Sequence, residues 1–214
     1  MSLIPVVFLH GFLGHPSDWD STLAYLPPCL SHCIELPGHG VSPFVKNFQI
    51  KVPYKKFHLI GYSMGGRLAM QYAMRFPEKI LSLTILSAHP GLKTTKEKQE
   101  RLQLDKKWAQ KLSTLSIDEF LSQWYDQPLF QSFKPDFLMR RNHQIKELTS
   151  ALLHYSLAHQ VFHKPKQALY VVGEKDEKYR CIYPEAHIIP EAGHMIHLQN
   201  PKAVAKVIEQ RIFS

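Results

Sequence analysis

Residues 61–67 read GYSMGGR and follow directly on an apolar run, FHLI, at 57–60. Glycines at 61 and 65 stand two positions to either side of Ser63, and a third glycine follows at 66. The pattern G-x-S-x-G is typical of a sharp turn from a strand into a helix, where the serine backbone is strained and a Cβ at either flank would collide with its neighbours. Such a turn raises the hydroxyl to the edge of the sheet and aims a helix N-terminus at it. The alternative is a glycine-rich turn in which the serine is incidental.

Five more apolar runs, each followed by a turn signal, indicate the rest of a sheet. They lie at 6–9, 33–36, 83–86, 168–172 and 186–189. The runs are continuous and not alternating, which is typical of strands buried on both faces in a parallel sheet. Helical patterning separates most of them, and the clearest stretches are 17–26, 63–76 and 201–213, the last opened by Asn200 and Pro201. We therefore expect a single α/β domain over residues 1–214, with a doubly wound, mostly parallel sheet of about six strands and helices on both faces.

A long segment, about residues 92–165, separates the fourth run from the fifth and contains only helical patterns. Thr94 with Glu97 and Ser116 with Glu119 form two capping boxes, each of which precedes an amphipathic run. Ligands of open α/β sheets bind beyond the carboxyl ends of the strands, so helices inserted there would roof a pocket. We expect this segment to form a helical cap over the sheet.

A serine hydroxyl becomes a nucleophile or a base when a histidine accepts its proton and a carboxylate orients that histidine. Both partners follow the predicted fifth and sixth strands, Asp176 in VVGEKD and His194 in PEAGH, in the chain order serine, aspartate, histidine. We predict Ser63, Asp176 and His194 as a catalytic triad. Glu174 is the alternative carboxylate and His197 the alternative histidine. An H-x-x-H pair without further ligands is weak evidence for a metal site.

The loop after the first apolar run, His10-Gly11-Phe12, matches the position from which a second backbone donor stabilises developing negative charge. We predict the backbone N–H groups of Phe12 and Met64 as an oxyanion hole. For His10, a structural role in the turn is preferred to a direct part in the chemistry.

Composition narrows the classes of partner. The formal net charge is +8, but the basic region 91–166, with 13 Lys or Arg against 8 Asp or Glu, lacks the interleaved aromatic residues of a nucleic-acid site. A solvated basic face and a site for a small polyanionic substrate remain as explanations. No apolar run reaches the roughly 20 residues of a membrane span, and the start lacks the features of a signal peptide. Since the three cysteines have no metal-like spacing, we expect a cytoplasmic protein without disulfides, metal or organic cofactor.

The motifs HGFLG, LPGHG, GYSMGG, GEKD and AGH together resemble the α/β-hydrolase superfamily across about residues 5–213. A narrower resemblance lies in GYSMGGR with HPGL at 89–92, QERLQLDKKW and FLSQWYDQP. These look like the 2-succinyl-6-hydroxy-2,4-cyclohexadiene-1-carboxylate synthase (MenH) family of menaquinone biosynthesis. That family uses a hydrolase-type triad to eliminate pyruvate from a cyclohexene substrate with three carboxylates. The resemblance implies that Ser63, deprotonated through His194, removes a proton beside the succinyl ketone of that substrate.

The same resemblance implies a set of substrate-binding residues: Tyr62, Arg67, Arg101, Trp124 and Arg140. Arginine suits carboxylates because its planar guanidinium binds them through two parallel hydrogen bonds. Arg140 has Arg141 beside it as a rival, and Trp124 could instead belong to the core of the cap.

Arg101 has a structural alternative as well. Glu97 lies four residues before it and Asp105 four after it, so an exposed ion pair on the helix would explain it. Leu104 and Trp108, at helical spacing from it, indicate instead that this face is buried. The pocket interpretation is preferred.

Two connections are shorter than in the family that this sequence resembles, at 42–56 and 177–185. The alternation of Phe48, Ile50 and Val52 predicts an extended segment in the first of them. We expect one sheet face to be covered mainly by the C-terminal helix and this segment, and the resulting apolar patch to be buried by self-association into a homo-oligomer.

Two other functions would use the same fold. A serine esterase or thioesterase acting on a small acidic ester would need the triad but not three converging arginines. A non-catalytic ligand-binding protein would need neither the triad nor the three arginines. The presence of all three triad residues argues against this non-catalytic function.

Overall fold

The computed structural model describes residues 4–213. Its centre is a six-stranded sheet in the order β2-β1-β3-β4-β5-β6, and every neighbouring pair is parallel. The strands are β1 (Pro5–Leu9), β2 (Leu30–Ile34), β3 (Phe57–Tyr62), β4 (Ile80–Leu86), β5 (Leu169–Gly173) and β6 (His187–Ile189). The predicted parallel sheet of about six strands is confirmed.

Strand β2 lies earlier in the chain than the predicted run 33–36. The Leu30 N–H donates to the Ile4 carbonyl at 2.8 Å, so the pairing with β1 already begins there. The strand ends before Glu35, whose carboxylate accepts hydrogen bonds from two backbone N–H groups of the following loop. Leu36 is buried beneath this loop and takes no part in the strand. The apolar run predicted a buried residue correctly at this position but did not mark the end of the strand.

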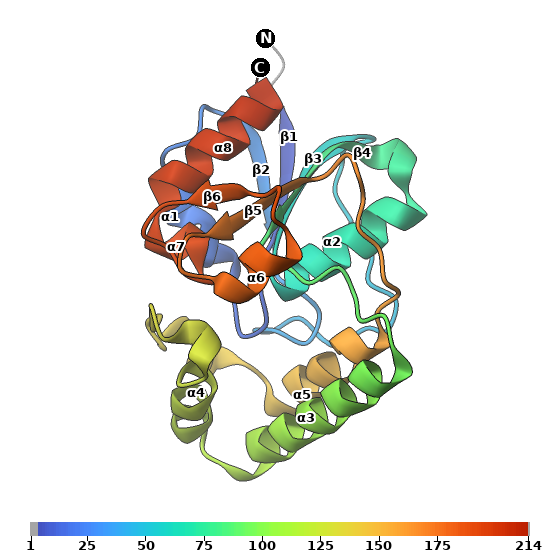
Figure 1. Cartoon of the computed structure of the whole chain (residues 1–214), viewed down its shortest axis with the longest axis vertical. Helices are drawn as coiled ribbons and strands as arrows, with labels where there is room; N and C mark the ends of the chain where they lie inside the picture. Colours follow the sequence, from blue (N-terminus) through green and yellow to red (C-terminus); the bar gives the residue numbers. More distant parts are fainter. Residues whose placement is uncertain (1–3, 214) are drawn as a thin grey trace.

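Helices cover both faces of the sheet, as predicted. They are α1 (Asp20–Leu23), α2 (Met64–Arg75), α6 (Glu177–Ile182), α7 (Ile196–Gln199) and α8 (Pro201–Phe213), with short 3-10 turns η1 (Pro16–Trp19) and η2 (Pro77–Lys79). Alternate residues of each strand point to opposite faces. Val6 of β1 joins the hydrophobic cluster that contains α8, whereas Val7 joins the cluster that contains α2. Helices α1 and α8 pack against each other on one side of the sheet (Figure 1).

Residues 42–56 form neither helix nor strand, but they show the predicted alternation, since Phe48 and Ile50 are buried while Gln49 and Lys51 are exposed. Phe48 and Ile50 belong to the same cluster as α2. The prediction that this segment shares a sheet face with α8 is therefore wrong. The chain crosses the sheet between β6 and α8, so that α8 packs with α1 on the opposite face.

The cap segment, residues 92–165, lies between β4 and β5. It forms α3 (Thr95–Thr114), α4 (Ile117–Tyr125) and α5 (Ile145–His154), with 3-10 turns η3 (Pro128–Phe130), η4 (Met139–Asn142) and η5 (Leu157–His159). Both predicted capping boxes are present, at Thr94 and Ser116. Figure 1 shows its three helices gathered beyond one end of the sheet, opposite the end at which β1 begins. No helix within residues 4–213 is both long and apolar enough to cross a membrane.

Candidate active site

Ser63 forms the turn between β3 and α2. Its backbone has φ 50° and ψ −112°, a positive-φ conformation that residues with a side chain rarely adopt. A Cβ on Gly61 would lie 2.6 Å from the Gly65 carbonyl oxygen, and one on Gly65 would strike the carbonyl groups of Leu9 and His10. The steric reason predicted for the flanking glycines is confirmed, and Ser63 lines a cavity that cap residues also line.

Three side chains meet at this turn. His194 Nε2 lies 3.2 Å from Ser63 Oγ, and His194 Nδ1 lies 2.8 Å from Asp176 Oδ2. Because an ionised carboxylate only accepts hydrogen bonds, Nδ1 carries the proton and donates it to Asp176. Nε2 is then left as an acceptor for the Ser63 hydroxyl. His194 and Asp176 are both buried, so water competes little with this chain of hydrogen bonds.

Local structure fixes the carboxylate and the imidazole. Asp176 is the N-cap of α6, where its Oδ1 accepts the Tyr179 N–H at 3.3 Å. The imidazole of His194 is enclosed by three aromatic rings, whose centroids lie 4.9, 5.4 and 5.7 Å away: Tyr179, Tyr62 and Phe130. These contacts hold both groups in the orientation that the hydrogen bonds require.

The two alternatives considered from the sequence are placed elsewhere. Glu174 is exposed, and its carboxylate accepts a backbone N–H at 2.8 Å in the loop after β6. His197 is buried against Trp19 and Tyr62, with ring centroids 4.8 and 4.3 Å away, and burial lowers its pKa to about 3. No group of three or more His, Cys, Asp or Glu side chains within residues 4–213 is arranged to hold a metal ion. Neither Glu174 nor His197 therefore joins the hydrogen-bonded group at Ser63.

Phe12 and Met64 line the cavity beside Ser63. Met64 is the first residue of α2, so its N–H has no acceptor within the helix. Across the described part of the chain, neither this N–H nor that of Phe12 donates a hydrogen bond to another protein group. Two unengaged backbone donors beside a serine are what an oxyanion hole requires.

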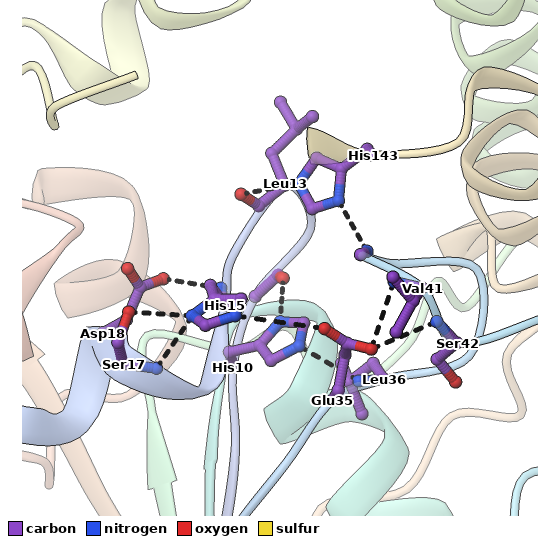
Figure 2. Close-up of polar contacts among 12 residues, drawn as sticks. His10, Leu13, His15, Ser17, Asp18, Glu35, Leu36, Val41, Ser42 and His143 are labelled. Carbon is purple, nitrogen blue, oxygen red and sulfur yellow. Dashed lines mark hydrogen bonds and ion pairs between the residues drawn. The ribbon is translucent and has the colours of Figure 1, made fainter. Parts of the chain in front are cut away.

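The loop after β1 is tied to its neighbours by two buried histidines (Figure 2). His10 Nε2 accepts the Leu36 N–H at 3.0 Å, while its Nδ1–H donates to an adjoining carbonyl at 2.8 Å. His143 of the cap segment accepts the Gly40 N–H at 2.8 Å and donates to the Leu13 carbonyl at 3.2 Å. Burial lowers the pKa of each ring to about 4, so each keeps one accepting nitrogen at neutral pH. His10 thus holds the turn, which is the role preferred for it from the sequence.

The cavity at Ser63 has a volume of about 220 Å³ and lies between the sheet and the cap segment. Three cationic side chains line it, Arg67 of α2, Arg101 of α3 and Lys178 of α6, and Asp105 is its one acidic residue within the described range. Aromatic rings, including Trp124, form much of the remaining wall. Such a wall suits an anionic ligand with an apolar body.

The two arginines are oriented by the protein and still keep nitrogens for a ligand. Arg101 Nε donates to both Asp105 oxygens, at 2.8 and 3.0 Å, and Asp105 is buried and also accepts the Ser156 hydroxyl at 2.6 Å. Arg67 Nη1 donates to the Tyr155 carbonyl at 2.6 Å. Within residues 4–213, both terminal nitrogens of Arg101 and Nη2 of Arg67 have no protein acceptor. The ion pair considered as an alternative for Arg101 therefore exists, and it positions the guanidinium at the cavity.

Arg140 is placed differently. Its Nη2 donates to Asp18 Oδ1 at 2.9 Å, its Nε to the Tyr125 hydroxyl at 3.0 Å and its Nη1 to the Asp136 carbonyl at 3.2 Å. It is 4% exposed and lines a separate cavity of about 30 Å³ that also reaches Ser63. Its guanidinium is engaged by the protein on every nitrogen.

The other predicted residues divide between wall and core. Trp124 lines the 220 Å³ cavity and also packs against Phe120 within the cap, and its contact with a substrate stays a prediction. Tyr62 is buried behind the imidazole and reaches only the smaller cavity of the two. Arg141 forms an exposed ion pair with Asp118. The prediction of a buried Leu104 is wrong, because this side chain lines the open cavity and remains 47% exposed.

Residues 4–186 match the family model described as alpha/beta hydrolase fold. The chain belongs to the alpha/beta hydrolase fold family. A 2-succinyl-6-hydroxy-2,4-cyclohexadiene-1-carboxylate synthase from Enterobacter sp. (strain 638) is 33% identical, over 96% of this chain and 90% of the relative. The solved structure of MenH from S. aureus has a TM-score of 0.79 at 24% identity, covering 96% of this chain and 91% of that one. A thermophilic esterase from Thermogutta terrifontis has a TM-score of 0.67 at 18% identity, covering 98% and 89%.

The residues of this alpha/beta hydrolase that line the cavity and were not predicted from the sequence include His89, Gln127 and Lys178. His89 Nδ1 accepts a backbone N–H at 3.1 Å, and burial lowers its pKa to about 4, so its proton is on Nε2. The HPGL motif could have identified His89, because it follows the fourth strand at the edge where the triad lies. Lys175 and Lys178 are both exposed, and nothing in the periodicity of GEKDEK shows that only Lys178 lines this cavity.

Proposed function

We propose that this chain is a lyase of menaquinone biosynthesis. It eliminates pyruvate from 2-succinyl-5-enolpyruvyl-6-hydroxy-3-cyclohexene-1-carboxylate and gives 2-succinyl-6-hydroxy-2,4-cyclohexadiene-1-carboxylate. The observation that carries this proposal is the cavity itself, where unengaged guanidinium nitrogens of Arg67 and Arg101 accompany a hydrogen-bonded Ser63. The name of the 33% identical Enterobacter relative supports the same product. A tricarboxylate matches a cationic wall, whereas a neutral ester has no use for it.

The triad supplies the base. His194 takes the proton of the Ser63 hydroxyl, and the resulting alkoxide removes the proton from the ring carbon beside the succinyl ketone. The electrons of that carbon–hydrogen bond form a ring double bond, the existing double bond moves by one position, and the carbon–oxygen bond to the enolpyruvyl group breaks. The proton held by His194 is then available to the departing group, which leaves as pyruvate. Water is not a reactant in these steps.

Fixed dipoles and charges lower the barrier. Negative charge develops on the succinyl ketone oxygen, where the N–H groups of Phe12 and Met64 and the N-terminus of α2 stabilise it. Asp176 stabilises the imidazolium of His194 while it holds the serine proton. The arginines hold substrate carboxylates so that the ring carbon faces Ser63, which converts binding energy into orientation.

A coupled assay tests the proposal. Lactate dehydrogenase and NADH report pyruvate released from the enolpyruvyl substrate, and we expect release by the wild type and a loss of several orders of magnitude in Ser63→Ala. Neutral p-nitrophenyl esters serve as the competing substrate. A folded wild-type protein that releases no pyruvate overturns the proposal, and faster turnover of the neutral esters would instead identify a serine esterase or thioesterase. Undiminished turnover in Ser63→Ala would exclude the triad from the reaction.

A further inference from the structure

Of the three cations that line the Ser63 cavity, only Arg101 forms an ion pair within residues 4–213. Lys178 forms no ion pair within residues 4–213, although it shares the cavity with Arg67 and Arg101. Desolvation and the charge of Arg101 lower the pKa of Lys178, while the charge of Asp176 opposes them, and Lys178 makes the largest charge contribution to the lowered pKa of His89. Three cations against the single carboxylate of Asp105 leave an excess of positive charge along the cavity wall, and like charges repel one another. Such an arrangement indicates that a ligand brings the missing negative charge.

The third cation implied by the family resemblance, Arg140, is held by protein acceptors and lines only the smaller cavity at Ser63. Arg140 donates from every guanidinium nitrogen to protein acceptors, and its partner Asp18 is buried. Withdrawing Arg140 toward a substrate would leave that carboxylate buried without a counter-ion, which is strongly unfavourable. Lys178 can meet a third carboxylate at no such cost.

Lys178 also lies between the Ser63 cavity and a second, outer hollow. Together with Pro128 and Leu129 it lines both the 220 Å³ cavity and an adjoining hollow of about 510 Å³, which Ser63 does not line. It occupies the first turn of α6, two residues after Asp176, which caps that helix. A substrate that comes in through the outer hollow therefore meets Lys178 before it reaches the serine.

We propose that Lys178 binds one carboxylate of the polyanionic substrate at the mouth of the cavity and thereby sets the preference for polyanions, an inference that rests on the proposed function. The three cations come from α2, α3 and α6, so they approach the cavity from three separate elements. An ammonium on a flexible stem suits the outermost position, because it can follow a carboxylate as the substrate settles.

Steady-state kinetics of pyruvate release provide the first test. We expect Lys178→Gln to raise KM about 10- to 100-fold, the loss typical of a charge-assisted hydrogen bond, with kcat changed by less than about threefold. Lys178→Arg retains the charge and should recover most of the lost affinity. Lys175→Gln is the matched control, since Lys175 is exposed, lines the outer hollow and is absent from the inner cavity. A fall in kcat with unchanged KM would mean that Lys178 acts through the triad and would overturn the inference.

Direct binding separates this inference from the proposed function. Benzene-1,2,4-tricarboxylate, titrated into the protein by calorimetry, probes the cationic wall without any turnover. We expect wild type and Lys175→Gln to bind it equally and Lys178→Gln to bind it about tenfold or more weakly. Equal binding by all three proteins, or none by the wild type, overturns the role of Lys178. Absence of pyruvate release with this ranking of affinities would overturn the lyase assignment and leave the polyanion site standing.

Discussion

The strained backbone of Ser63 is sustained by its immediate neighbours. A positive φ at a residue with a side chain costs about 1–3 kcal/mol. The Ser63 N–H donates to the Leu86 carbonyl at 2.9 Å, and its carbonyl accepts the Arg67 N–H at 3.0 Å. These bonds join the turn to β4 and α2, so the hydroxyl is oriented toward His194 before any ligand binds. The proposed proton transfer then needs little reorganisation of the Ser63 hydroxyl.

Asp176→Asn tests the orientation of the imidazole. The amide can donate a hydrogen bond to Nδ1, which favours the tautomer in which Nε2 carries the proton and cannot accept the Ser63 hydroxyl. We expect kcat for pyruvate release to fall by about 10³–10⁴. Glu174→Gln changes the rejected alternative carboxylate and should leave kcat within about twofold. Equal losses in the two variants would contradict the assignment of Asp176.

Arg140→Gln tests the buried ion pair with Asp18. The two side chains are 5% and 9% exposed, so removing the guanidinium leaves a buried carboxylate uncompensated. We expect the free energy of unfolding to fall by about 3–5 kcal/mol in denaturant titrations. Arg141→Gln is the control, because its pair with Asp118 is 47% and 59% exposed and should change stability by less than about 1 kcal/mol. Similar losses from both substitutions would show that burial does not decide the effect.

At the scale of elements, local chemistry predicted well where a helix or turn begins. The capping boxes at Thr94 and Ser116 depend on residues three apart in sequence, and both helices start where these boxes place them. The side chain of Asn200 accepts the Ala203 N–H at 3.2 Å, as its position before α8 predicted. The G-x-S-x-G turn was equally predictable, because the steric need for glycine lies within five residues.

Features that depend on distant parts of the chain could not be predicted in this way. The bounds of β2 are set by pairing with β1 and by the turn at Glu35, and neither is encoded in an apolar run. The face that α8 covers depends on how the chain crosses the sheet. The engagement of Arg140 depends on Asp18, which lies 122 residues away in sequence. For the same reason, the position of Lys178 beside Arg67 and Arg101 could be seen only in the folded structure, where α2, α3 and α6 meet.

Acid should weaken the junction between the loop after β1 and the cap segment. The pKa of His10 and of His143 falls from an ordinary value of 6.5 to about 4 in the folded protein, because both rings are buried. Between these values the unfolded chain binds more protons, so this stabilisation is complete above about pH 6.5 and is lost as pH falls toward 4. Denaturant midpoints should therefore decline from pH 7 to pH 5.

The histidines can be separated by substitution. His143→Gln should flatten this decline in part, since His10 and other buried histidines still contribute, whereas substitution of the exposed His187 by Gln should leave the slope unchanged. Identical slopes for wild type and His143→Gln would show that this junction does not titrate.

At the scale of the whole molecule, the net charge of +8 should speed the arrival of a polyanion. Salt screens such long-range attraction, with a Debye length of about 10 Å at 0.1 M. We expect kcat/KM for pyruvate release to fall severalfold between low and physiological ionic strength, mainly through KM. Thermal unfolding measured at the same salt concentrations controls for stability. A salt-independent kcat/KM would indicate that the basic residues form a solvated surface and do not attract the substrate.

Self-association stays a prediction, and the described surface shows where to test it. Met74 and Leu81 are 41% and 49% exposed beside a groove of about 470 Å³, which lies at the end of β4 remote from Ser63. Exposed apolar side chains of this kind favour association. We expect light scattering at high concentration to report a mass above 24.8 kDa and Leu81→Lys to lower it. A monomeric mass for the wild type would contradict this prediction.

The buried carboxylate of Asp105 has a mechanical consequence. It accepts hydrogen bonds from Arg101 on α3 and from Ser156 beyond α5, so it connects these two parts of the cap segment. Arg67 lies on α2, and its hydrogen bond to the Tyr155 carbonyl connects α2 to this same part of the cap segment before any ligand binds. A ligand that binds both guanidinium groups then adds a further connection between the cap segment and α2. Each additional carboxylate that the protein binds should stabilise the closed cavity further.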